Sequence, residues 1–391
     1  MLMDPLSWIE DELDSLEQQQ LRRFTSTRSG PQDVHQVVLN GQSLLNFASN
    51  DYLGFAAELA AMSHDGDWLA DGWGSGASPL LAGRSELHEQ LECQLARFEQ
   101  TEAALLFPSG FAANTGTIPA LVGPGDVILS DAKNHASIID GCRLSGATLA
   151  IYRHLDTDHV RQLLGQHATA KRRLLVTDTL FSMDGDIAPL EELADLAEQH
   201  EAILMVDEAH ATGILGPGGR GVCELAGVSD RVQVKVGTLS KALGSCGGFV
   251  AGSALLVQWL ANCARSYVFS TAPAGPLAAA ALCSLRWIDE YPERREQVLA
   301  SACQLREELA SQGWMVSGQK AQIIALPVGD PGLAVQLSAG LREQGMLLPA
   351  IRPPTVPGGE SMLRISVGYR HRPADLEQLA RALDKCRSLL V

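Results

Sequence analysis

The sequence predicts an α/β protein with a mainly parallel central sheet in a large domain and a smaller α+β domain at the carboxyl end. Three observations favour this fold class. From about residue 100, short apolar runs alternate with helical patterns, as in successive βα units. Past about Pro273, long helical patterns are separated by only a few apolar runs. The 391 residues are enough for a large domain and a smaller one.

The first segment is expected to be a helical arm, because apolar residues recur at helical spacing from Leu6 to Leu21. In the large domain, AALLF is followed by SGFAANTGTIPAL, DVILS by HASIIDGCRLSG and LLVTDTLF by PLEELADLAEQH. The strands AILMVD, VQVKVGT and GGFVAG follow, with a helix from about Ala254. The predicted division is an arm over 1–45, a large domain over 46–285 and a small domain over 286–391.

Past about Pro273 the sequence predicts two long helices, over roughly 274–289 and 293–312. The strand IIALPV, a helix near 333–344, the strand MLRISV and a final helix near 374–390 follow. This order is typical of an α+β domain.

The composition excludes several classes of protein. A formal net charge of −16 lacks the electrostatic signature of a nucleic-acid binder and gains nothing from an anionic membrane. The eight cysteines include no CxxC pair, which favours reduced thiols over a zinc or redox site. No apolar run approaches the roughly 20 residues that span a bilayer, and the acidic first segment is unlike a signal peptide. A cytoplasmic protein is expected.

The segment VGTLSKALGSCGG places Lys241 among small and apolar residues, just after Thr238 and Ser240. Lysine is rarely buried, since desolvating an ammonium is costly. One interpretation is a surface turn whose lysine points to water. The other is a lysine in a partly dry pocket, acting as an amine nucleophile toward a carbonyl.

Further polar residues follow other predicted strands. Asp207 and His210 come at the end of LMVD, Ser182 follows LLVTDTLF, and His135 follows DVILS. Gly110 lies where PSGFAAN turns into a helix, whose free N–H groups suit an anion. Carboxyl ends of parallel strands meet at one edge, so these residues indicate a site. We expect no metal there, because no further His or carboxylate cluster accompanies Asp207 and His210.

The run GPGGRG, Gly216 to Gly221, matches the dinucleotide pattern GxGxxG. It lies about ten residues past its strand and contains Pro217, whereas that fingerprint occupies a tight strand-to-helix turn. We interpret it as a glycine-rich loop.

A lysine amine, a phosphate-binding turn and a strand-end carboxylate together suit pyridoxal phosphate. Lys241 would be the Schiff-base lysine and Asp207 the partner of the pyridinium nitrogen. His210 and Ser182 would contact the ring oxygen, and His135 would stack on the ring face. Thr238 and Ser240 would contact the phosphate.

At this point the sequence resembles the α-oxoamine synthases, fold-type I pyridoxal-phosphate enzymes that share the aspartate aminotransferase-like fold. The resemblance covers almost the whole chain in ordered blocks: NFASNDYLG, GSGAS, EAALLFPSGFAAN, LSDAKNHASIIDGCRLSGA, FSMDGDIAPL, VDEAHATG, GTLSKALG and IRPPTVP. HASIIDGCRLSGA and IRPPTVP most resemble the branch that joins L-alanine to a pimeloyl thioester in biotin biosynthesis. The resemblance therefore implies a decarboxylative condensation that releases CO2 and the thiol, from CoA or a carrier protein.

The resemblance also implies roles for individual residues. Lys241, His135 and Asp207 would be catalytic, with Lys241 also moving the substrate α-proton. Gly110 and Phe111 would lie at the phosphate end. The implied substrate contacts are Arg364 at the amino-acid carboxylate, Asn50 beside it, and Arg22 (or the adjacent Arg23) and Thr355 elsewhere on the substrate.

A homodimer with shared active sites is expected in this family, with Thr271 of the YVFST stretch reaching the neighbour's phosphate. The alternative is that Ser270 and Thr271 only cap the helix that begins near Pro273. Three other functions are alternatives: a sister synthase that uses glycine or serine or a different acyl thioester, an NAD-dependent oxidoreductase that binds its cofactor at GPGGRG, and a catalytically inactive binding protein.

Overall fold

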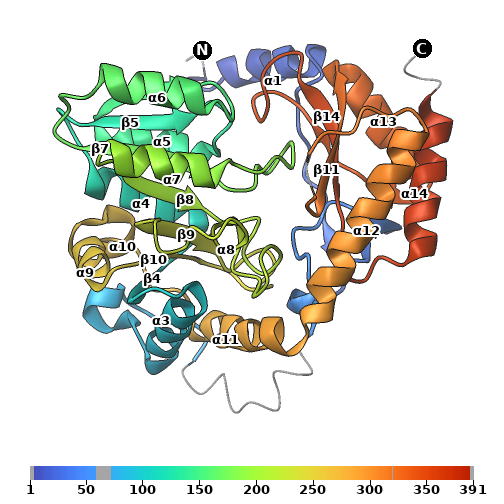
Figure 1. Cartoon of the computed structure of the whole chain (residues 1–391). Helices are drawn as coiled ribbons and strands as arrows, with labels where there is room; N and C mark the ends of the chain where they lie inside the picture. Colours follow the sequence, from blue (N-terminus) through green and yellow to red (C-terminus); the bar gives the residue numbers. More distant parts are fainter. Residues whose placement is uncertain (1–3, 59–71, 319, 388–391) are drawn as a thin grey trace. The chain divides into compact units, whose positions relative to one another are not determined.

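The computed structural model describes residues 4–58, 72–318 and 320–387. Packing groups the chain into two units, which are described separately (Figure 1). The large unit comprises 53–182 and 186–296, and the composite unit comprises the described parts of 1–52, 183–185 and 297–391. The first segment thus packs with the last one, a grouping that chain order does not indicate. The sequence-based boundaries at 45 and 285 stay predictions.

The large unit is built on a seven-stranded sheet of order β4-β10-β9-β8-β7-β5-β6. β10 is antiparallel to both neighbours, and all pairs from β9 to β6 are parallel, which confirms the mainly parallel sheet. The strands are β4 (Ala103–Phe107), β5 (Val127–Asp131), β6 (Thr148–Tyr152), β7 (Arg173–Asp178), β8 (Ile203–Asp207), β9 (Val234–Thr238) and β10 (Gly248–Gly252).

Both faces of this sheet are buried, so its central strands are continuous apolar runs rather than alternating ones. Met205 and Val176 pack in a core with residues of α4, α5, α9 and α10. Leu204 and Val206 alternate with them and face the other side, where α7 contacts β8 (Figure 1). The helices are α3 (Glu86–Glu99), α4 (Gly110–Leu121), α5 (Ala136–Ser145), α6 (Thr157–Gln166), α7 (Leu190–Gln199), α8 (Val222–Leu225), α9 (Ala254–Cys263), α10 (Arg265–Val268) and α11 (Gly275–Glu290), with short turns at Phe55–Ala57 and Pro79–Gly83.

The composite unit has two small sheets, β1-β2-β3-β12 and β11-β14-β13, and helices that share one core. β12 pairs with β3 in parallel, so a sheet formed by strands before residue 47 gains its last strand from residues near 346. The elements are α1 (Trp8–Gln18), β1 (Arg28–Ser29), β2 (Gln36–Leu39), β3 (Gln42–Asn46), α12 (Pro292–Ser311), β11 (Ile323–Gly329), α13 (Pro331–Glu343), β12 (Met346–Leu347), β13 (Ala350–Ile351), β14 (Ser361–Ser366) and α14 (Pro373–Cys386).

Within the residues that the structure describes, no helix combines the length and the apolar composition needed to cross a membrane.

Candidate active site

Acidic side chains end three neighbouring parallel strands of the large unit. β5 ends at Asp131, β7 at Asp178 and β8 at Asp207, and Asp178 lies opposite Asp207 in the β7–β8 register. β9 pairs with β8 and ends at Thr238, and Lys241 follows three residues later. The structure therefore gathers at one edge the strand ends from which the sequence predicted a site.

Asp207 is held in one orientation by two hydrogen bonds. It is 5% exposed, and its Oδ1 accepts from the backbone N–H of Ala209 at 2.8 Å. Its Oδ2 accepts from Asn114 Nδ2 at 2.6 Å, across 93 residues of sequence. Asn114 is fully buried on α4, and its Nδ2 also donates to Ser137 Oγ at 2.9 Å. Sequence reasoning missed Asn114, because nothing in FAAN marks which side chain points inward.

His135 is the next group in this network. Its Nδ1 lies 2.8 Å from Ser137 Oγ, so a continuous chain of hydrogen bonds joins His135 to Asp207 through Ser137 and Asn114. The backbone N–H of His135 donates to Asp178 Oδ2 at 2.7 Å. The Phe111 ring meets the His135 ring edge-on, with centroids 6.5 Å apart. The position of His135 is thus fixed on three sides.

The protein shifts the pKa values of His135 and Asp178, two of the groups at this edge of the sheet. The pKa of His135 is lowered, chiefly because the protein removes water from the ring, although part of the residue stays exposed. The negative charge of Asp207 raises this pKa, and the positive charge of Lys241 lowers it further. The pKa of Asp178 is raised, because the side chain is buried and lies beside the negative charge of Asp207. Acidic neighbours whose environments differ in this way are common at catalytic sites.

A turn lined with N–H and hydroxyl groups lies beside β9. α4 begins at Gly110, and the place of a Cβ there would be 3.4 Å from Thr238 Cβ. A Cβ on Gly248 would clash at 2.5 Å with the Gly110 nitrogen, so glycine permits this close approach. Thr238 Oγ1 lies 2.8 Å from Ser240 Oγ. Ser109 Oγ accepts from the N–H of Ala112 at 3.0 Å, and the N–H groups of Gly110 and Phe111, with these hydroxyls, suit an anion such as phosphate.

The remaining predicted groups of the large unit lie on loops after strands. Lys241 is half-buried, and its carbonyl accepts from the N–H of Gly244 in a tight turn. Ser182 is half-buried after β7, and His210 is buried after β8. The structure shows their placement, and their roles toward a cofactor stay predictions.

Thr271 is exposed between α10 and α11. The alternative that it or Ser270 caps the following helix is wrong: α11 begins at Gly275, its N-cap is Ala274, and no side chain caps it. Helix capping therefore does not explain Thr271.

Arg364 and Asn50 come together in the composite unit. Arg364 lies on β14, is 5% exposed, and its guanidinium donates to Asn50 Oδ1 at 3.2 Å and to Ser366 Oγ at 2.8 Å. The guanidinium also donates to the hydroxyl of Tyr52 at 3.3 Å. Sequence reasoning missed Tyr52. These partners are neutral oxygens that hold the guanidinium fork in place, as recognition of a carboxylate requires.

Arg22 and Arg23 have different surroundings. Arg22 forms an ion pair with Glu17 at 2.5 Å. Arg23 donates to the carbonyl of Pro353 at 3.1 Å, in the IRPPTVP loop that also carries the exposed Thr355. The choice between the two arginines as a substrate contact stays open.

Backbone N–H groups of the loop GPGGRG are hydrogen-bonded to the side chain of Glu224, which follows the loop. The backbone nitrogens of Gly218 and Arg220 each donate to the Glu224 carboxylate at 3.0 Å. The helix that follows, α8, has only four residues. A carboxylate of the chain thus takes the hydrogen bonds that a dinucleotide phosphate would need, which argues against the NAD alternative.

Comparisons with known proteins agree over nearly the whole chain. The family model for class I and II aminotransferases matches residues 42–383. The chain is 48% identical to the 8-amino-7-oxononanoate synthase of Anaeromyxobacter sp., over 98% of this chain and 97% of that protein. A serine palmitoyltransferase from S. paucimobilis, solved with a bound PLP–myriocin aldimine, matches with a TM-score of 0.93 and 28% identity over 100% of this chain and 99% of that one. The 8-amino-7-oxononanoate synthase of Francisella tularensis matches with a TM-score of 0.72 and 27% identity, over 88% and 97%.

Proposed function

The chain belongs to the class I and II aminotransferase family, and from its similarity to 8-amino-7-oxononanoate synthases we propose that it condenses L-alanine with a pimeloyl thioester. This is the reaction of an 8-amino-7-oxononanoate synthase in biotin biosynthesis. The products are 8-amino-7-oxononanoate, CO2 and the thiol of the acyl carrier. The chain is thus a pyridoxal-phosphate-dependent acyltransferase acting on small-molecule substrates.

The observation that carries the proposal is the placement of Asp207 and Lys241. Asp207 ends β8, and Lys241 follows the end of β9, the adjacent strand. The residues present fit pyridoxal phosphate, because they combine an amine, an oriented carboxylate and, at Gly110 and Thr238, donors for a phosphate. Ser240, Ser182, His210, Phe111 and Thr271 are the further residues that we propose as cofactor contacts.

When bound, pyridoxal phosphate supplies an electron sink for negative charge at the amino-acid α-carbon. Asp207 is proposed to keep a proton on the pyridine nitrogen, and the Asn114 and Ala209 hydrogen bonds fix the oxygen that does so. Lys241 Nζ is proposed to hold the cofactor and then to remove the α-proton of alanine. His135 is proposed to lie against the ring face, where the Ser137 contact sets its orientation.

Residues of the composite unit are proposed to bind the substrates. The Arg364 guanidinium would hold the carboxylate of alanine in a bidentate pair, with Asn50 beside it. Arg22 or Arg23, and Thr355, are proposed contacts of the acyl donor. We also propose a cytoplasmic location.

Product identification tests the function directly. The purified protein with pyridoxal phosphate is offered L-alanine, L-serine or glycine with pimeloyl-CoA or palmitoyl-CoA, and the products are identified by mass spectrometry. We expect 8-amino-7-oxononanoate from L-alanine and pimeloyl-CoA to form fastest. A preference for L-serine with palmitoyl-CoA would replace this proposal with a sister synthase, the class of the serine palmitoyltransferase match.

We propose that the chain forms a homodimer in which Thr271 reaches the phosphate of the neighbouring subunit. Its exposure, and the absence of a capping role, support this. If each site takes Lys241 from one subunit and Thr271 from the other, mixing Lys241→Ala with Thr271→Ala subunits rebuilds one intact site in each mixed dimer. Random exchange should restore roughly a quarter of wild-type activity, because half the dimers are mixed and each has one good site.

The activity of the mixture is compared with that of each parent, after subunit exchange has been verified by native mass spectrometry. An inactive mixture, despite exchange and an inactive Thr271→Ala parent, would refute the shared site.

A further inference from the structure

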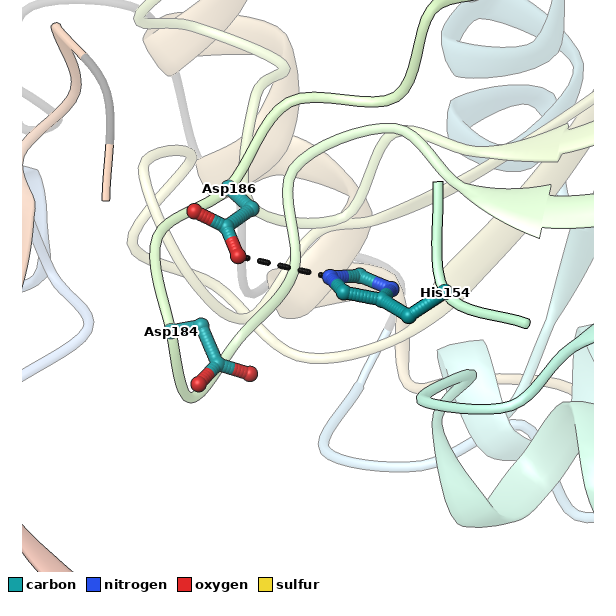
Figure 2. Close-up of side chains that lie close together, drawn as sticks. All are labelled: His154, Asp184 and Asp186. Carbon is teal, nitrogen blue, oxygen red and sulfur yellow. Dashed lines mark hydrogen bonds and ion pairs between the residues drawn. The ribbon is translucent and has the colours of Figure 1, made fainter. Parts of the chain in front are cut away.

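His154 lies between β6 and α6 and is hydrogen-bonded through both ring nitrogens. Nδ1 is 2.8 Å from Asp131 Oδ1. Nε2 is 3.3 Å from Asp186 Oδ2, the contact that is dashed in Figure 2. The ring also meets Phe181 edge-on, with centroids 4.5 Å apart. The side chain is only 18% exposed, so these contacts take up most of its surface. The mechanism proposed above makes no use of this histidine.

The two carboxylates that His154 joins belong to different loops. Asp131 ends β5 and accepts from the N–H groups of Lys133 at 2.8 Å and Leu155 at 3.0 Å, which fixes the start of the loop leading to His135. Asp186 closes the segment that begins after β7, since its carbonyl accepts from the N–H of Phe181 at 2.9 Å.

Ser182 directly follows Phe181 in the second loop. Each of the two loops therefore carries one proposed contact to the cofactor ring, His135 on the first and Ser182 on the second.

The surroundings of His154 favour the protonated form of the ring. Burial lowers the pKa of His154, but the hydrogen bonds to Asp131 and Asp186 outweigh it and raise the pKa to about 9, with Lys133 opposing them. Both ring nitrogens are already hydrogen-bonded to carboxylates of the chain, so we do not interpret this group as a metal site. Asp184, also drawn in Figure 2, belongs to the composite unit.

We propose that His154 is a positioning residue: by donating from both ring nitrogens, it clamps Asp131 to Asp186 and so sets the His135 loop and the Ser182 loop against the cofactor. The inference rests on the proposed cofactor site, but not on which acyl donor the enzyme uses. A neutral replacement would remove the cation that both carboxylates face. The two loops would then separate, and the cofactor would bind more weakly.

The test measures binding of pyridoxal phosphate to the cofactor-free protein by fluorescence titration, without any turnover. His154→Gln keeps a polar side chain but loses the charge, and we expect its Kd to rise at least about tenfold. His154→Arg can donate to both carboxylates and stays charged at every pH used, so it should remain within about threefold of wild type. His167→Gln, at the C-cap of α6, is the matched control and should bind as wild type does.

The pH profile separates positioning from general stability. Because the folded-state pKa of His154 is above its unfolded value, the clamp is complete below about pH 6.5 and is lost as the pH rises through about 9. Wild-type affinity should therefore fall between pH 8 and 10 relative to that of His154→Arg. Other titrating groups, including Lys241 and the cofactor itself, are common to both proteins and cancel in the ratio.

Equal affinity of His154→Gln and wild type, or a wild-type to His154→Arg ratio that does not change with pH, would overturn the proposal. If His154→Gln does not fold, the proposal is tested by the pH dependence of the ratio of wild-type to His154→Arg affinity. Asp186→Asn is measured as well, and should weaken cofactor binding as His154→Gln would. Failure of the wild-type protein itself to bind pyridoxal phosphate would instead refute the proposed function.

Discussion

Replacing Lys241 by alanine should lower turnover at least about 1,000-fold, because the amine serves both as the covalent attachment and as the base for the α-proton. The fold should survive, since the lysine is half-buried on a loop and belongs to no helix or strand. Turnover is measured as product formed from L-alanine and pimeloyl-CoA, and folding by circular dichroism.

Lys171→Ala is the matched control, because Lys171 is exposed on the same unit, in the loop before β7. It should retain wild-type activity. A Lys241→Ala protein whose turnover stays within about tenfold of wild type would remove Lys241 from the mechanism.

Replacing Asp207 by asparagine should slow removal of the α-proton at least about 100-fold. The side chain keeps its shape but loses the charge that raises the pKa of the pyridine nitrogen, and each pKa unit is worth about 1.4 kcal/mol. Asparagine also accepts through only one atom, so the hydrogen bond from Asn114 or from Ala209 is lost. Exchange of the α-proton of L-alanine in D2O, followed by NMR, isolates this step from the acyl transfer.

Asp178→Asn is an isosteric control on the neighbouring strand. Asp178 Oδ2 accepts from the backbone N–H of His135, a bond that the oxygen of asparagine can also accept, so this variant should slow exchange less than about tenfold. Equal losses in the two variants would mean that any carboxylate at this edge suffices, and that Asp207 has no special role.

The central strands of the large unit could be predicted because a sheet covered on both faces needs continuous apolar runs. β6 was missed: it is an edge strand whose burial alternates, with Ile151 57% exposed, so it lacks the fully buried run that marks the central strands. α6, which follows it, was missed with it. The residues of the candidate site that directly follow parallel strands could also be predicted, since such strands bring Asp207 and His135 to one edge of the sheet.

The supporting residues could not be predicted in the same way. Asn114 reaches Asp207 across 93 residues, and His154 reaches Asp131 and Asp186 across 23 and 32. Such contacts depend on how helices and loops pack on the sheet, which neither periodicity nor local motifs specify. Tyr52 is a similar case, since its hydroxyl meets Arg364 across 312 residues.

The pairing of β3 with β12 has a consequence for how the protein is made. Gln42 and Arg342 are 300 residues apart and share a hydrogen bond of 3.0 Å, and Phe47 lies in the same core as residues of α13 and α14. During synthesis, the first segment leaves the ribosome long before its partners exist, and closing so long a loop is slow. The strands of the large unit, all between residues 103 and 252, emerge in between and can assemble first. The composite unit must therefore be the last part to form, so a nascent chain halted before β12 would expose an unpaired apolar strand to chaperones and proteases.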